Sequence, residues 1–262
     1  MAARAIWKGC IEFGSISVPI KLYSAVQEKG VHFRLLDRRT KKPVKQRMIR
    51  PDSGDVVEHA ETKRAVELDR RNLVILDEED IEKVDPPASR DIEILHFYKP
   101  EVITHQWFER PYWVGPDGNT KSYFALAAAL AKEEREGLAR WVMRKKEYFG
   151  ALRPEGDHLM LVTLRNAEEV VDPASISLPA GRDLSAKEIS MAKSLIAAME
   201  GELDMSEYKD EYRARVLEFV EAKAAGKVIR FPKAKEKAAS DSDLTAVLQR
   251  SLAAAKGERA SA

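Results

Sequence analysis

The densest group of charged side chains lies between residues 34 and 50, in the sequence RLLDRRTKKPVKQRMIR. It holds eight bases against a single acid, Asp37, for a net charge of +7, whereas the whole chain has a net charge of only +1. Lysine and arginine are the side chains that contact the phosphates of nucleic acids. We therefore predict that this segment binds a polyanion through Arg34, Arg38, Arg39, Lys41, Lys42, Lys45, Arg47 and Arg50.

Two smaller basic groups accompany the first, one near residue 63 and one within residues 140–153. If the second is a strand, Arg140, Arg144 and Lys146 share one face, and Trp141 and Met143 take the other. Groups that are separate in sequence can meet on one surface and follow a phosphate backbone. For each group the alternative is an ordinary solvated face. The candidate nucleic-acid-binding residues here are Lys63, Arg64, Arg140, Arg144 and Lys146.

The sequence contains no catalytic motif. The five histidines lack metal-ligand spacing, and neither a phosphate-binding glycine loop nor a nucleophile elbow occurs. The one dense carboxylate group, residues 77–80, stands where a helix is expected to begin, and acids there interact favourably with the helix dipole. A hydrolase built from these acids and a histidine is the weaker alternative. We predict a binding protein with no catalytic residue, no cofactor and no metal.

The composition also indicates in which cellular compartment the protein is expected. The single cysteine, Cys10, excludes an internal disulfide and a thiolate zinc site. The N-terminal residues carry charges without an apolar core, unlike a secretory signal. The longest apolar run, residues 124–131, is far shorter than a membrane span. These features predict a cytoplasmic protein with no membrane partner, and the expected association with the nucleoid is implied by the family resemblance described below.

Strands and turns are predicted to dominate the first two thirds of the chain, because apolar residues alternate with polar ones over short stretches between turn residues. Two helices interrupt them, one beginning near Asp77 and one covering about 122–138. The expected strands are 31–35, a buried run at 73–76, 92–97, 111–114 and 158–164.

The last third is predicted to be helical. Ser185 and Glu188 have the spacing of a capping box, and a second helix is expected over about 206–225, with Gly226 as its stop. A polar linker at 227–240 separates this part from a short amphipathic helix at 241–255. The apolar face of that helix consists of Leu244, Val247, Leu248 and Leu252.

A series of short motifs runs in order through almost the whole chain. It begins with Trp7-Lys8-Gly9, Phe13-Gly14 and Val18 to Tyr23, continues through 92–97 and Tyr112, and includes 123–126, Leu152-Arg153-Pro154 and 208–223. In this combination the chain resembles the bacterial Ku family, the DNA-end-binding proteins of non-homologous end joining. Two places depart from the family pattern: FGSISVP replaces an FGLVNVP-type loop, and residues 61–65 replace KGYE-like residues.

The resemblance implies a β-rich α+β fold, with a Ku-type β-barrel and an extended DNA-encircling bridge, followed by a C-terminal helical arm and a short tethered helix. The expected parts are 1–184 for barrel and bridge, 185–226 for the arm, 227–240 for a flexible Lys/Ala-rich linker, and 241–262 for the terminal helix and tail. A ring of this kind needs distributed bases and no recognition helix, which agrees with the charge pattern.

The resemblance also implies partners. They are the ends of double-stranded DNA, a second copy of the chain in a ring-shaped homodimer, and the ATP-dependent DNA ligase (ligase D), which the C-terminal helix would recruit. One alternative is a general nucleic-acid-binding barrel for RNA or single strands, which needs no free end. For the tail, the alternative is a helix that folds back onto the body.

The stretch FGSISVPIKLY contains a change of phase. Large apolar residues fall on odd positions up to Phe13 and on even positions from Ile16. Successive strand residues point to opposite faces, so a shift of one residue turns the pattern over. We predict a β-bulge at Gly14-Ser15, where a strand bends into the barrel wall. Pro19, which has no N–H to donate, is expected at an edge or beside the bulge.

Overall fold

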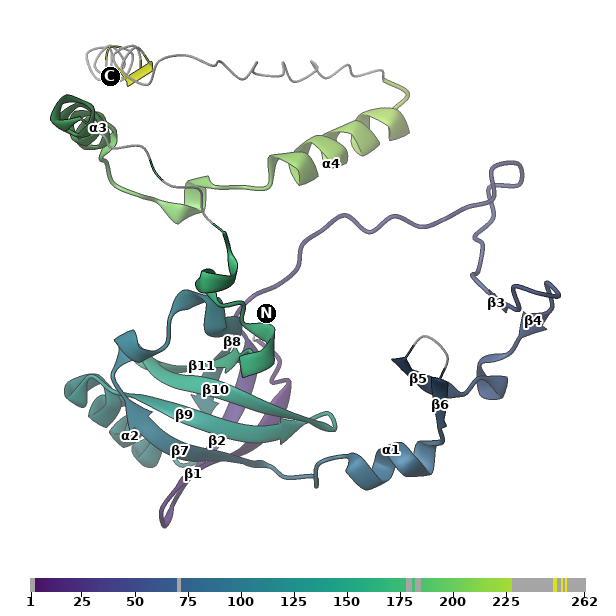
Figure 1. The fold of residues 1–262 in the computed structure, drawn as a ribbon, viewed down its shortest axis with the longest axis horizontal. Coiled ribbons are helices and arrows are strands. Elements are labelled where there is room, and N and C mark those ends of the chain that lie inside the picture. Colours follow the sequence, from purple (N-terminus) through teal and green to yellow (C-terminus); the bar gives the residue numbers. More distant parts are fainter. Residues whose placement is uncertain are drawn as a thin grey trace. The chain divides into compact units, whose positions relative to one another are not determined.

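A closed β-barrel forms the body of the protein (Figure 1). The computed structural model describes residues 3–69, 72–177, 181, 185–227, 247–248, 251 and 253. The strand order around the barrel is β1-β2-β8-β11-β10-β9-β7, and the β1–β7 pair is parallel whereas the other pairs are antiparallel. The strands are β1 (Trp7–Phe13), β2 (Ile16–Ser24), β7 (Asp91–Tyr98), β8 (Phe108–Pro116), β9 (Glu136–Met143), β10 (Lys146–Glu155) and β11 (His158–Leu164).

The phase change in FGSISVPIKLY marks a hairpin turn, so the predicted bulge at Gly14-Ser15 is wrong. Phe13 pairs with Ile16 across a two-residue turn, and Ile11 pairs with Val18 further along. Facing residues of antiparallel strands point to the same side of a sheet, so odd positions of β1 share a face with even positions of β2. Gly14 has φ 57°, a conformation that glycine adopts without strain.

Pro19 lies inside the β1–β2 ladder and just outside the β2–β8 ladder, so the predicted edge position holds only on the β8 side and the predicted bulge is absent. It faces Cys10 of β1, whose N–H donates instead to the carbonyl oxygen of Arg90 at 2.9 Å. Pairing of β2 with β8 begins only at Ile20, and the Pro19 carbonyl accepts a hydrogen bond of 3.0 Å from the N–H of Asp117. The missing N–H of proline therefore costs the barrel no hydrogen bond.

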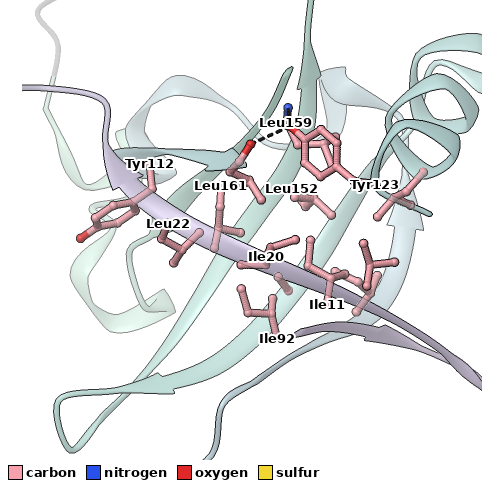
Figure 2. Packing of buried hydrophobic residues seen from close by; sticks show 14 of the residues in the cluster. Ile11, Ile20, Leu22, Ile92, Tyr112, Tyr123, Leu152, Leu159 and Leu161 are labelled. Atoms are coloured by element: carbon pink, nitrogen blue, oxygen red, sulfur yellow. Dashed lines mark hydrogen bonds between the residues drawn. The ribbon is translucent and has the colours of Figure 1, made fainter. Parts of the chain in front are cut away.

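The inward-facing side chains of the strands fill the barrel (Figure 2). The helix α2 (Thr120–Glu133) packs against it through Tyr123, whose hydroxyl donates to the Val114 carbonyl oxygen at 2.6 Å and accepts from the Leu159 N–H at 2.8 Å. Burial of each large apolar side chain contributes about 1.5–3 kcal/mol. The fully buried aliphatic residues include Ile11, Ile20, Leu22, Ile92, Leu152, Leu159 and Leu161.

The helix α2 ends earlier than the predicted residue 138. Glu134 has φ 51°, in the left-handed region, and closes the helix. From Glu136 onward the chain pairs with β7 and β10 as β9. Leu138 continues the apolar pattern of the helix in sequence, but its place is decided by strand pairing, because tertiary contacts override local propensity.

Residues 25–90, which we call the β2–β7 connection, carry small separate sheets (Figure 1). In these sheets, β3 (Met48–Ile49) pairs with β4 (Val56–Val57), and β5 (Arg64–Asp69) pairs with β6 (Asn72–Leu76). The helix α1 (Glu78–Val84) follows, with a capping box between Asp77 and Asp80. The predicted start of this helix near Asp77 is confirmed.

Two predictions within this connection are wrong. Residues 31–35 form no strand, and the nearest sheet-type pairing is a single bridge between Leu36 and Pro43. The run at 73–76 is a strand but is not buried, since Leu73 is 69% and Ile75 61% exposed. A continuous apolar run is typical of a strand that another part of the protein covers. No part of the chain that the structure describes covers this strand.

The C-terminal helices belong to a second compact unit, residues 30–32 and 176–262. The helix α3 (Ala186–Met199) begins with the predicted capping box between Ser185 and Glu188. The helix α4 (Glu211–Ala224) ends before Gly226, which has φ 71°. It begins later than the predicted residue 206, because a 3₁₀ turn, Met205–Glu207, precedes it.

Two aromatic side chains of α4, Tyr212 and Phe219, are 67% and 43% exposed. Of the predicted terminal helix, Val247 and Leu248 are helical, whereas Leu244 and Leu252 lie outside the described residues, as does nearly all of the linker 227–240. Within the described chain, no helix combines the length and apolar character that crossing a membrane requires.

Candidate nucleic-acid interface

The basic segment 34–50 is built around a tight turn. The Asp37 carboxylate accepts hydrogen bonds from the Thr40 hydroxyl at 2.7 Å and the Thr40 N–H at 2.6 Å, and these bonds lower the pKa of Asp37. The Asp37 N–H donates to the Lys42 carbonyl oxygen at 2.8 Å, and Lys41 completes the turn with φ 58°. The only acid of the segment thus folds its own loop and does not neutralise a base.

All eight bases of this segment are exposed, and none has an acidic partner among the described residues. Four of them, Arg38, Arg39, Lys41 and Lys42, stand on the turn itself. Like charges held this close repel each other, and a polyanion relieves that repulsion. The geometry leaves these side chains free to contact phosphates.

The pair Lys63 and Arg64 differs in its electrostatics. Lys63 Nζ lies 2.8 Å from Asp77 Oδ1, and this hydrogen bond raises the pKa of Lys63. Arg64, the first residue of β5, is exposed and has no acidic partner in the chain described. Exposed salt bridges contribute only about 0–1 kcal/mol, so a phosphate can compete for Lys63.

The common face predicted for Arg140, Arg144 and Lys146 is wrong. Arg140 lies in β9 and forms a salt bridge of 2.6 Å with Glu93. Arg144-Lys145 is the two-residue turn of the β9–β10 hairpin, with φ of 56° and 64°. Lys146 begins β10 opposite the buried Met143, on the strand face that Arg140 does not share. Side chains alternate between the two faces only within one strand. The hairpin turn ends that alternation, so positions before and after the turn cannot be assigned to a face by counting along the sequence.

Arg153, the last base of the 140–153 group, is used to stabilise the barrel wall. Its Nη2 lies 3.1 Å from Oε1 of Glu136, which is 1% exposed, and the Tyr98 hydroxyl donates to Oε2 of Glu136 at 3.3 Å. Burial raises the pKa of Glu136, while Arg153 and Tyr98 act in the opposite direction. We therefore do not include Arg153 in the candidate interface.

The carboxylates of residues 77–80 cap a helix. The Asp80 carboxylate accepts from the Asp77 N–H at 3.2 Å, and Asp77 in turn holds Lys63. In the part of the chain that the structure describes, no group of three His, Cys, Asp or Glu side chains is placed to hold a metal ion. The hydrolase alternative therefore has no geometric support among these residues.

Charge counting along the sequence misses two further bases, Lys8 and Arg90. They line a cavity together with Arg144 and the ring of Trp7. Only the parallel pairing of β1 with β7 brings residues 8 and 90 together. The one sequence feature that could have indicated the place is the Trp7-Lys8-Gly9 motif.

A closed β-barrel carries a connection whose segment 34–50 is basic, exposed and without acidic partners among the described residues, an arrangement suited to binding a polyanion. Residues 12–192 match the family model described as the Ku70/Ku80 beta-barrel domain. The chain therefore belongs to the Ku family. This confirms the resemblance seen in the sequence and, because Ku proteins are not catalytic, the prediction that the protein is not an enzyme.

Curated relatives are similar in sequence to this chain over nearly its full length. The non-homologous end joining protein Ku of Anaeromyxobacter sp. (strain K) is 34% identical over 256 residues, which cover 97% of this chain and 86% of the relative. The protein of the same name from Coxiella burnetii is 35% identical over 89% of this chain and 87% of its own length. That of Pseudomonas aeruginosa is 32% identical over 97% and 90%.

Proposed function

We propose that the protein binds the ends of double-stranded DNA, without sequence specificity, as a ring-shaped homodimer in non-homologous end joining. The observation that carries this proposal is the segment 34–50, whose eight exposed bases have no acidic partner in the described chain. Phosphate contacts hold a protein on a duplex without reading its bases. The relatives named for end joining support the same role.

The homodimer is supported by the uncovered apolar surface of the β2–β7 connection. Side chains on both faces of the β5–β6 hairpin are strongly exposed, including Val66 at 51%, Leu68 at 73% and Leu73 at 69%. A two-stranded hairpin alone is marginally stable in water, and large exposed apolar patches mark interaction surfaces. A second copy would cover this surface and, by two-fold symmetry, place a second basic segment against the same duplex.

The recruitment of the ATP-dependent DNA ligase (ligase D) is assigned to residues 241–262. The apolar residues at helical spacing, Val247 and Leu248 among them, suit a helix that docks into a groove of the ligase. The polar linker 227–240 would let this helix search for its partner while the body stays on DNA.

End recognition is tested by comparing linear duplex with covalently closed duplex of the same sequence, at one fixed salt concentration. A protein that threads onto ends binds the linear form and does not load onto the closed form. A second pair of duplexes with an unrelated sequence checks that no base sequence is read. Equal affinity for linear and closed DNA would refute the proposal and favour a general nucleic-acid-binding barrel.

A further inference from the structure

A cavity of about 550 Å³ lies where the start of β1 meets the segment before β7 and the turn of the β9–β10 hairpin. Its lining combines two kinds of surface, an aromatic and aliphatic part and a basic part. The apolar part includes Trp7, Pro86 and Val142, and the basic part consists of Lys8, Arg90, Arg144 and Lys145.

Gly9 allows two walls of this cavity to come together. A Cβ atom at this position would lie 2.1 Å from the Arg90 carbonyl oxygen and 2.1 Å from Cη2 of Trp7. The next residue, Cys10, binds that same carbonyl oxygen through its N–H at 2.9 Å. The Trp7 ring therefore lies against its own strand, next to the backbone of Arg90, because position 9 has no side chain.

Two of the four bases are already engaged. Lys145 lies 3.0 Å from Asp85, and Lys8 lies 3.3 Å from Asp117. Arg90 and Arg144 are exposed and have no acidic partner within the described residues. Among the bases that line the cavity, Arg90 and Arg144 are therefore the two without an acidic partner in the described chain.

We propose that this cavity binds an unpaired nucleotide of a DNA end, with the base against Trp7 and the phosphate between Arg90 and Arg144. Stacking on an aromatic ring together with basic phosphate contacts is the chemistry by which proteins hold single strands. A site for phosphate alone would need no apolar wall. The cavity also falls in the usual range of about 300–1,000 Å³ for small-ligand sites.

The inference rests on the proposed function, because the unpaired nucleotide belongs to a DNA end that the protein has bound. It adds that the barrel distinguishes an overhanging end from a blunt end. The test compares the affinities of the full-length protein for a blunt duplex and for the same duplex with a three-nucleotide overhang, 3′ or 5′. We expect the wild-type protein to prefer an overhang of one polarity by about tenfold, the effect typical of one stacked base.

The double variant Arg90→Gln, Arg144→Asn removes the phosphate contacts, and asparagine tolerates the left-handed backbone of position 144. We expect it to lose the overhang preference, so that overhanging and blunt ends bind this variant with equal affinity. Trp7→Leu keeps an apolar wall without a ring and is expected to lose the same preference. Lys121→Gln with Lys132→Gln, on exposed positions of α2, is the matched control and is expected to keep it.

Equal wild-type affinity for blunt and overhanging ends would overturn the inference and leave the proposed function standing. An equal loss on both ends in the arginine variant would assign the two residues to the duplex backbone and also overturn it. Retained preference in a folded Trp7→Leu variant would exclude stacking on that ring. Only a failure of the wild type to prefer linear over closed DNA bears on the proposed function itself.

Discussion

Neutralising the tight turn of segment 34–50 should remove much of the electrostatic component of DNA binding. The variant combines Arg38→Gln, Arg39→Gln, Lys41→Asn and Lys42→Gln. Asparagine is chosen at position 41 because the backbone there has φ 58° and asparagine tolerates that region. Asp37 and Thr40 are retained, so the hydrogen bonds that fold the turn are preserved.

The magnitude follows from counterion release. Each phosphate that a base neutralises on B-DNA contributes about −0.9 to the slope of log K against log salt. If all eight bases of the segment contact phosphates, they supply a slope of about −7, and removing four reduces it to about −3.6. Between 50 and 200 mM salt, the affinity loss due to this segment should shrink from roughly four decades to roughly two.

The assay is fluorescence anisotropy with a blunt duplex, measured over that salt range. The matched control neutralises four exposed lysines elsewhere, Lys121, Lys132, Lys187 and Lys193, and so changes the net charge by the same amount. We expect the control to keep a slope close to that of wild type. A turn variant that keeps the wild-type slope would refute the assignment of this segment to DNA.

Three further predictions concern the tail, the dimer and the barrel wall. Deleting residues 241–262 should leave DNA binding unchanged and abolish stimulation of the ligase in an end-joining assay; stimulation that survives would exclude this segment as the recruiting element. The double change Leu68→Asp, Leu73→Asp should shift the sedimentation mass from twice 29.5 kDa to 29.5 kDa, and an unchanged dimer would place the interface elsewhere. Burial raises the pKa of Glu136 above its ordinary value of 4.5. Just above pH 4.5 the folded protein therefore binds more protons at this carboxyl than the unfolded chain does. The stability that this group contributes falls as the pH rises through that range. Glu136→Gln should remove this fall in urea unfolding, and identical pH profiles for the two proteins would contradict the reasoning.

Local patterns in the sequence are enough to predict several elements. The strand β11 (His158–Leu164) coincides with the predicted 158–164, and the capping residues Asp77 and Ser185 stand at the starts of α1 and α3. In these places alternation, turn residues and caps are all local and agree with one another. The free basic segment is equally visible, since eight bases against one acid need no knowledge of the fold.

The errors occur where the outcome depends on residues far away in sequence. The predicted common face of Arg140, Arg144 and Lys146 fails because Arg144 lies in a hairpin turn. The acidic partners of Arg140 and Arg153, Glu93 and Glu136, lie on neighbouring strands. Residues 73–76 were predicted to be buried because a continuous apolar run is typical of a covered strand, and no described residue covers them. The cavity beside Arg90 depends on the pairing of β1 with β7, which no short-range pattern indicates.

The proposed encirclement of duplex DNA is tested most directly by trapping the protein on DNA whose ends are sealed after loading. The protein is loaded onto linear duplex, both ends are sealed with hairpin oligonucleotides, and the complex is challenged with 1 M salt and excess competitor DNA. At that salt concentration the Debye length is about 3 Å, so electrostatic attraction alone cannot hold the complex. We predict that protein loaded before sealing stays bound and that protein added after sealing does not load. Equal release from sealed and unsealed duplex would contradict encirclement.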